Sequence, residues 1–346
     1  MEGETIRWED DTGEVSLLDQ TALPARVRRI RCRDVERLAE AIRRLEIRGA
    51  PALGVAGAYG VALAAARSRE QDLEPFLADV SDAAVLLRST RPTAVNLSWG
   101  IDRVLLKVQA ARSIAECRRV ALAEAKAVAA EDALICRRIG DHGASLLPDR
   151  GTVLTHCNAG ALATSEWGTA LGVIRSAVAA GKEIRVLACE TRPLLQGARL
   201  TAWELARDGI PVTVIVDSAA ASLMQAGEVD CVIVGADRIT RDAVFNKVGT
   251  YMHAVCARHH GIPFYVAAPR STLDPGSTAA GVVVEERARE EVSRFGSRQV
   301  VPDAAGVRNP AFDATPFPLV SAIITEDGIH RPPFDTLGRA AGRSRR

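Results

Sequence analysis

Six short apolar runs that alternate with segments of helical spacing dominate the second half of the chain. A nearly continuous apolar run is typical of a strand buried on both faces, and such strands occur mainly in parallel sheets covered by helices. The pattern therefore predicts a doubly wound α/β domain over residues 151–334. The expected strands are 152–157, 184–190, 211–217, 230–237, 263–269 and 320–325, with helical segments near 161–180, 194–208, 219–227 and 246–260.

The first 142 residues have a different pattern. Alternating apolar residues on both sides of the turn at 10–13 predict a small antiparallel sheet. Helical spacing follows over 38–45, 73–87 and 114–139. Glycine and proline interrupt the helical period at 143–151, so we expect a mostly helical N-terminal domain over 1–142. The basic residues 335–346 are expected to form a flexible tail.

Residues 49–66 carry no charge and approach the length of a membrane span. Most of them are alanine and glycine, which gain little in lipid and pack closely in a protein core, so we expect a buried helix and no membrane partner. The N-terminus has neither the basic start nor the apolar stretch of a secretory signal. The seven cysteines are odd in number and show no paired framework, so we expect them to be reduced thiols. Reduced thiols are typical of the cytoplasm, and the sequence therefore predicts a cytoplasmic location.

Charge and composition argue against nucleic acid as the partner. Lysine and arginine number 44 against 43 aspartate and glutamate, which leaves no excess positive charge to bind a polyanion. Aromatic residues make up only 4% of the chain, too few to build stacking platforms for single strands.

Ligands of doubly wound sheets bind beyond the carboxyl ends of the strands, so the residues there are the first candidates for chemistry. These are Cys157, Glu190, Asp217, Asp237 and Arg270.

Cys157 is the cysteine best placed to react. It ends a strand and precedes a polar, glycine-containing turn, and the free amides of a following helix start would favour an anion and lower a thiol pKa. The other six cysteines fall within apolar periods and are expected to fill cores. A catalytic dyad of Cys157 and His156 is not expected, because successive strand residues point to opposite faces, so His156 is expected to pack or to support the residues of the site.

Asp237 stands at the end of a strongly apolar strand. Desolvation at such a position raises a carboxyl pKa and suits the group to hold a proton near neutral pH. An ion pair with Arg238 or a helix cap is the alternative interpretation.

Three basic segments resemble anion-binding turns, because in each a cation adjoins glycine or proline. They are Arg48-Gly49-Ala50, Arg91-Pro92, and Asn246-Lys247 with Gly249 following; taken singly, each is also a plausible surface charge. His253, Cys256 and either His259 or His260 share one helix face, but no second ligand cluster accompanies them, so no metal is expected. No Gly-x-Gly-x-x-Gly fingerprint follows a strand, which argues against a dinucleotide and leaves no cofactor predicted.

Taken together and in order, these segments resemble the S-methyl-5-thioribose-1-phosphate isomerase family, which is related to the regulatory subunits of translation initiation factor 2B. The resemblance runs from about residue 47 to residue 328. It is carried by the motifs that begin at Arg48, Arg91, Thr155, Gly168, Glu190, Gly235 and Asn246.

The resemblance implies a Rossmann-like catalytic domain, a homodimer and a metal-free reaction. That reaction converts S-methyl-5-thioribose 1-phosphate into S-methyl-5-thioribulose 1-phosphate in methionine salvage. By motif, Cys157 and Asp237 match the catalytic pair. The matching substrate contacts are Arg48, Gly49, Ala50, Arg91, Gln196, Asn246 and Lys247.

Two loops depart from the family pattern. Residues 165–167 read Ser-Glu-Trp where the isomerases usually have a small residue, glycine and tyrosine, and the stretch between Asp237 and Asn246 is one residue short and lacks its usual glycine. These changes leave the 5-substituent of the sugar open. A sister isomerase for 5-deoxyribose 1-phosphate or ribose 1,5-bisphosphate, or a non-catalytic regulatory subunit, are the alternatives. An enediolate and a hydride-shift mechanism are both consistent with the sequence.

Overall fold

A computed structural model describes residues 5–92, 94–334 and 337 of the chain. The chain forms two units: one consists of residues 1–138 and 159–172, and the other of residues 139–158 and 173–346. The expected break at 143–151 covers the end of helix α5 (Ile114–Ala144), the loop after it and the start of strand β4 (Arg150–Thr155). The expected flexible tail, apart from Leu337, lies outside the described residues.

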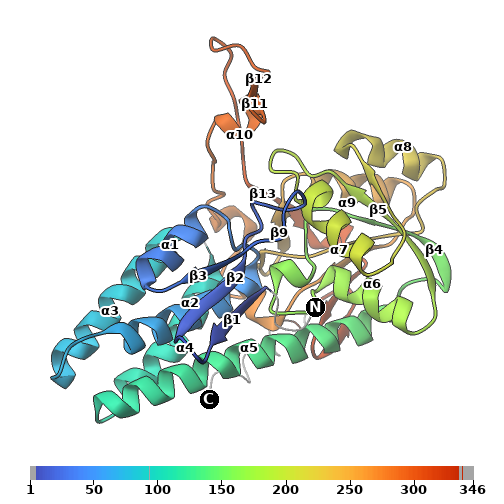
Figure 1. The fold of residues 1–346 in the computed structure, drawn as a ribbon. Coiled ribbons are helices and arrows are strands. Elements are labelled where there is room, and N and C mark those ends of the chain that lie inside the picture. The colour runs from blue at the N-terminus through green and yellow to red at the C-terminus, as the bar shows by residue number, and fades with distance from the viewer. Residues whose placement is uncertain (1–4, 93, 335–336, 338–346) are drawn as a thin grey trace. The chain divides into compact units, whose positions relative to one another are not determined.

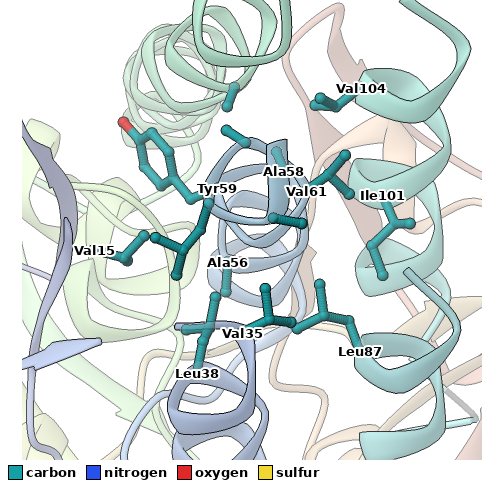
Figure 2. Close-up of a cluster of buried hydrophobic side chains, with 14 of the residues drawn as sticks. Val15, Val35, Leu38, Ala56, Ala58, Tyr59, Val61, Leu87, Ile101 and Val104 are labelled. Atoms are coloured by element: carbon teal, nitrogen blue, oxygen red, sulfur yellow. The ribbon is translucent and has the colours of Figure 1, made fainter. Parts of the chain in front are cut away.

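The first unit is built around helix α2 (Ala50–Arg67), against which α4 packs most extensively. Figure 2 shows side chains of α2 among those of its neighbours, with Val61 near Ile101 and Val104 of α4. A Cβ on Gly100 would lie 2.0 Å from the carbonyl oxygen of Gly54, so only glycine permits this approach of the two helices. The other helices are α1 (Val35–Arg43), α3 (Leu73–Thr90) and α4 (Val95–Gln109).

The expected small antiparallel sheet is confirmed, with β2 (Glu14–Leu18) between β1 (Ile6–Glu9) and β3 (Arg29–Cys32). Helix α2 has the length and apolar character that would let a helix cross a membrane. Fourteen of its residues are buried, from Ala52 to Ala65, so the prediction of a buried core helix is confirmed.

The second unit contains a seven-stranded sheet in the order β15-β14-β10-β7-β4-β5-β6. All six expected strands are present and parallel, and β15 (Gly328–His330) adds an antiparallel edge. In chain order the parallel strands follow the 3-2-1-4-5-6 pattern of a doubly wound Rossmann-like sheet, which confirms the predicted fold class. The remaining strands are β5 (Glu183–Cys189), β6 (Val212–Ile215), β7 (Cys231–Val234), β10 (Phe264–Ala267) and β14 (Ala322–Thr325).

Helices connect these strands (Figure 1). Helix α9 (Thr250–His259) packs on β7 and β10, α8 (Ala220–Gln225) packs on α9, and α7 (Ala202–Arg207) packs on β6. A π-helix (Gly197–Thr201) directly precedes α7. The expected helix over 161–180 is wrong in its first half, where only a 3-10 turn (Ala161–Ala163) precedes α6 (Ala170–Ala179).

The expected helix over 246–260 begins only at Thr250, because Asn246 and Lys247 belong to a strand and Gly249, with a φ of 104°, is the residue that precedes the helix. Residues 243–247 form β9 (Ala243–Lys247), which lies between β8 (Arg238–Ile239) and β13 (Phe312–Pro316) in a second antiparallel sheet. A short hairpin of β11 (Arg294–Phe295) and β12 (Arg298–Gln299) follows the helical turn α10 (Glu290–Ser293).

Candidate active site

Strands β4 and β7 are the neighbours at which the strand order of the large sheet reverses. At such a point the following connections leave toward opposite sides, which opens a crevice outside the carboxyl ends of the strands. Leu154 pairs with Val232 in the register of β4 and β7, and the hydroxyl of Thr155 donates to the carbonyl oxygen of Ile233 at 2.8 Å. The two strands therefore end at the same edge.

Cys157 and Asp237 follow these two strands, two residues after β4 and three residues after β7. Both side chains are half-buried, so each remains accessible while losing part of its hydration. The structure thus places the predicted catalytic pair at the position where doubly wound sheets bind their ligands.

Cys157 differs from most of the other cysteines in its surroundings. Five of the seven are fully buried, and burial raises the pKa of Cys32 and of Cys231 to about 12. Such thiols are inert as nucleophiles. Cys256 is half-buried like Cys157, but it packs against the hydrophobic core of the second unit, as expected of the other cysteines.

The backbone of Asp237 begins the hairpin that carries two predicted substrate contacts. Its N–H donates to the carbonyl oxygen of Phe245 at 2.9 Å, which ties the end of the large sheet to β9. Asn246 and Lys247 lie on β9, and both are buried. The Asn246 amide donates to the Thr250 hydroxyl at 3.0 Å.

The ammonium of Lys247 donates to the carbonyl oxygen of Ala311 at 2.7 Å and lies 4.9 Å from the centroid of the Phe312 ring. Ala311 directly precedes β13, and Phe312 is its first residue. Lys247 therefore ties β9, the central strand of the small sheet, to the start of β13, in addition to any contact with a substrate.

Gln196 ends the connection from β5 and lies just before the π-helix. Its side-chain oxygen is buried and has no hydrogen-bond partner among the described residues. A buried acceptor without a partner is costly, so this oxygen is suited to accept a hydrogen bond from a ligand hydroxyl. A Cβ on Gly197 would lie 1.7 Å from the Cys189 carbonyl oxygen, so glycine is required where the π-helix meets β5.

The other predicted contacts belong to the first unit. Arg48 is buried, Gly49 has a φ of 95° at the start of α2, and Ala50 is the first residue of that helix. Free amides at a helix start favour an anion. Arg91 directly follows α3 as its C-cap residue. Thr93, in the same motif as Arg91, lies outside the described residues.

His156, Cys189 and His253 form a buried cluster in which one ligand atom from each lies within 4.8 Å of the others. His156 Nε2 lies 2.9 Å from the Val248 carbonyl oxygen, which can only accept, so Nε2 carries the hydrogen and Nδ1 is the acceptor. His253 Nε2, at 3.2 Å from that Nδ1, is then the donor. Burial lowers the pKa of His156 to about 4 and that of His253 to about 3, so both rings are neutral near pH 7.

In the sequence, His253 shares one helix face with Cys256 and either His259 or His260. In the structure His259 and His260 are exposed and contact each other, whereas His253 points toward the ends of β4 and β5. Residues from three separate elements meet here, and no spacing within one element could have indicated that.

The two loops that depart from the family pattern have local explanations. The Ser165 N–H and hydroxyl both donate to the Asp132 carboxylate, at 2.6 and 2.7 Å, and Trp167 lies under the Arg137 guanidinium. Residues 165–167 are thus fixed to α5. In the shortened loop, the Thr240 N–H donates to the Ala243 carbonyl oxygen at 2.9 Å, which closes the β8–β9 turn without a glycine.

Two residues that hold the Cys157 segment in place were not predicted as site residues: Thr191 and Thr201 are fully buried and bond to the backbone of Cys157. Asp217, a predicted candidate at a strand end, supports them by accepting the backbone N–H groups of Thr191 and Arg192. The only signal for the two threonines was the motif that begins at Glu190.

Comparisons with known proteins agree with this architecture over nearly the whole chain. A methylthioribose-1-phosphate isomerase of Heliobacterium modesticaldum is 53% identical over 335 residues, which cover 96% of each chain. A 5-deoxyribose 1-phosphate isomerase of Moorella thermoacetica is also 53% identical, over 333 residues that cover 95% of this chain and 94% of the relative. The crystal structure of 5-methylthioribose 1-phosphate isomerase from Pyrococcus horikoshii superimposes with a TM-score of 0.91 at 42% identity, covering 99% of this chain and 96% of that chain.

The model of the initiation factor 2 subunit family matches residues 46–332. The match includes every motif on which the resemblance was based. The chain belongs to the initiation factor 2 subunit family.

Proposed function

We propose that this chain is an aldose–ketose isomerase that converts S-methyl-5-thioribose 1-phosphate into S-methyl-5-thioribulose 1-phosphate, a reaction of methionine salvage. The observation that carries the proposal is the placement of Cys157 and Asp237 at the carboxyl ends of adjacent strands, where the sheet order reverses. The names of relatives that match nearly the whole chain support it.

The substrate explains why a thiol and a carboxyl group are needed. A phosphate on the anomeric carbon prevents spontaneous opening of the sugar ring. Asp237 would donate a proton to the ring oxygen as the bond between that oxygen and C1 breaks, and would recover a proton from the C2 hydroxyl as it becomes a carbonyl. Proton transfer by a positioned side chain contributes about 10²- to 10⁴-fold in rate.

The hydrogen on C2 must reach C1, and two routes balance. In the first, the Cys157 thiolate removes it as a proton, and the resulting thiol returns a proton to C1 of the enediolate. In the second, the hydrogen moves with its electron pair directly from C2 to C1, and Cys157 stabilises the cationic carbon. Turnover in heavy water distinguishes them, because deuterium at C1 of the product indicates the enediolate route.

Substrate binding in this proposal uses the contacts that the family resemblance assigns. The unpartnered oxygen of Gln196 supports a hydrogen bond to a sugar hydroxyl. Arg48 and Arg91 stay predicted phosphate contacts, and Gly49 and Ala50 stay predicted substrate contacts. The measurement for the two arginines is KM: Arg48→Lys and Arg91→Lys should raise it, because an ammonium cannot bind phosphate through two parallel N–H donors.

A sister isomerase is a second candidate, since the relative named for 5-deoxyribose 1-phosphate is as similar as the one named for methylthioribose 1-phosphate. Measuring kcat/KM for these two sugars and for ribose 1,5-bisphosphate identifies the substrate. An apolar pocket prefers the methylthio group, and a pocket with an extra cation prefers the second phosphate. Failure to isomerise any of them would favour the regulatory-subunit alternative.

We also propose a homodimer that resides in the cytoplasm. Tyr251, Met252 and Val255 expose 46%, 42% and 41% of their surface on α9, an apolar patch that a second copy would cover. All seven cysteines are free, which suits a reducing compartment. Sedimentation velocity measures the oligomeric state, and rapid alkylation of thiols in intact cells measures their redox state.

A further inference from the structure

The backbone of Cys157 adopts a conformation that its side chain disfavours. Its φ is 65°, in the left-handed region that glycine occupies freely and other residues rarely. A non-glycine residue stays in this region only where its surroundings hold it there. The structure shows which groups do so.

Two buried hydroxyls bond to the backbone of Cys157 from opposite sides. Its N–H donates to Thr191 Oγ1 at 2.9 Å, and its carbonyl oxygen accepts from Thr201 Oγ1 at 2.6 Å. Both threonines are fully buried, so no water competes for these bonds. The peptide units on both sides of the Cys157 Cα are thereby fixed.

The Thr191 hydroxyl is itself held in one orientation. It donates to the Cys189 carbonyl oxygen at 2.9 Å, which leaves its lone pairs to accept from Cys157. Thr191 has a φ of 66°, and the Asp217 carboxylate accepts its N–H at 2.8 Å and that of Arg192 at 2.7 Å. The ends of β5 and β6 therefore support this side of Cys157.

The Thr201 hydroxyl has support of the same kind. Because it donates to Cys157, it can accept from the Asn158 side-chain amide at 3.3 Å. That amide also donates to Glu204 Oε1 at 2.8 Å, and the Arg175 guanidinium donates to Glu204 Oε2 at 2.8 Å. Asn158, Glu204 and Arg175 are all buried, so this network is anchored in the interior of the second unit.

We propose that Thr191 and Thr201 are positioning residues that clamp Cys157 in its left-handed conformation and thereby fix the direction of its Cα–Cβ bond toward the reacting sugar. The proposal rests on the isomerase function. It gives a physical role to the motif that begins at Glu190, whose first and second threonines are these two residues.

The test uses variants that remove or keep a hydroxyl at nearly constant volume. Thr191→Val and Thr201→Val remove it, and Thr191→Ser and Thr201→Ser keep it. Thr155→Val is the matched control, because Thr155 is equally buried on β4 and its hydroxyl donates to Ile233 rather than to Cys157. Circular dichroism and thermal melting verify folding.

In the full-length protein, each valine variant should lower kcat about 10²-fold with little change in KM, as expected when a reacting group is displaced by about 1 Å. Each serine variant should recover most of the activity. Thr155→Val should stay within about threefold of the wild type. Folded valine variants with the activity of Thr155→Val would overturn the proposal.

A second readout does not depend on turnover. The rate of iodoacetamide labelling at Cys157, corrected with Cys157→Ala, is measured against pH for each variant. The valine variants should shift the labelling midpoint by at least about half a pH unit, and the serine variants and Thr155→Val should not. Unchanged profiles would reject the clamp, whereas a shifted profile without isomerisation of any sugar would reject the proposed function alone. If one valine variant fails to fold, the kinetics and labelling of the other valine variant test the proposal.

Discussion

At the scale of single residues, the candidate thiol and the residue that holds it share an unusual backbone geometry. Cys157 and Thr191 both have φ values near +65°, and the hydroxyl of the second bonds to the N–H of the first. Strained backbone is stable only where neighbouring bonds impose it. A residue that combines strain with a partly exposed nucleophile is a stronger candidate for chemistry than one with either feature alone.

The catalytic pair gives the most direct prediction at this scale. Cys157→Ser and Asp237→Asn should each reduce kcat about 10³-fold or more, because each removes a group that exchanges a proton or stabilises charge at the reacting carbons. Steady-state kinetics with purified protein provides the measurement, and unchanged melting temperatures show that folding is intact. A double variant with wild-type kcat would exclude both assignments.

Strain at position 157 has a separate consequence for stability. Cys157→Gly should be more stable than Cys157→Ala by about 1 kcal/mol, because glycine adopts a positive φ without a steric penalty that alanine incurs. Urea unfolding of both inactive variants measures the difference. Equal stabilities would mean that the left-handed conformation of this residue carries no cost.

Strands and helices of this chain were predictable to different degrees. The six parallel strands were found because each is a short apolar run between helical periods, and Cys157 and Asp237 were found because they end two of those strands. Strand β9 was mistaken for the start of a helix. Its partner β13 lies more than 60 residues further along the chain, and only that pairing defines it.

The supporting residues were beyond sequence reasoning for the same reason. The bonds from Thr191 and Thr201 to Cys157 span 34 and 44 positions, and hydroxyl-to-backbone bonds leave no periodic pattern in a sequence. The buried cluster of His156, Cys189 and His253 likewise joins three elements whose relative placement is set by the sheet order.

The contact between α2 and α4 gives a prediction at the scale of elements. Alanine normally stabilises a helix relative to glycine by about 1 kcal/mol. Gly100→Ala should instead destabilise the protein by about 3 kcal/mol, because the new methyl would lie 2.0 Å from the Gly54 carbonyl oxygen and must push the helices apart. Lys107→Ala, on the exposed face of α4, should change stability by less than about 0.5 kcal/mol. Chemical denaturation of the two variants compares them, and a Gly100→Ala protein as stable as the wild type would contradict the close packing.

At the scale of the whole molecule, the buried histidines make stability depend on pH. Their folded pKa values, about 4 for His156 and about 3 for His253, lie below the ordinary value of 6.5, so the unfolded chain takes up protons first. Their contribution is complete above pH 6.5 and is lost as the pH falls toward 4. The slope is at most about 1.4 kcal/mol per pH unit for each histidine.

His253→Gln should therefore show a shallower loss of stability than the wild type between pH 6.5 and pH 4, measured by urea unfolding at several pH values. Asp313, whose pKa burial raises to about 6, contributes a slope of the opposite sign over this range. It is present in both proteins and cancels in their difference. Parallel stability curves would mean that His253 is charged in the folded protein or exposed.

Residues 159–172 belong to the first unit although residues 139–158 of the second unit precede them in the chain. This arrangement limits when the first unit can complete its folding during synthesis. When only the first 142 residues have left the ribosome, residues 159–172, which complete the first unit, are still missing. Strand β4 of the second unit emerges before them. A fragment ending at 142 should consequently be a poor substitute for the intact unit in limited proteolysis. Because each unit is built from two separate chain segments, cleavage at one position cannot release either unit intact.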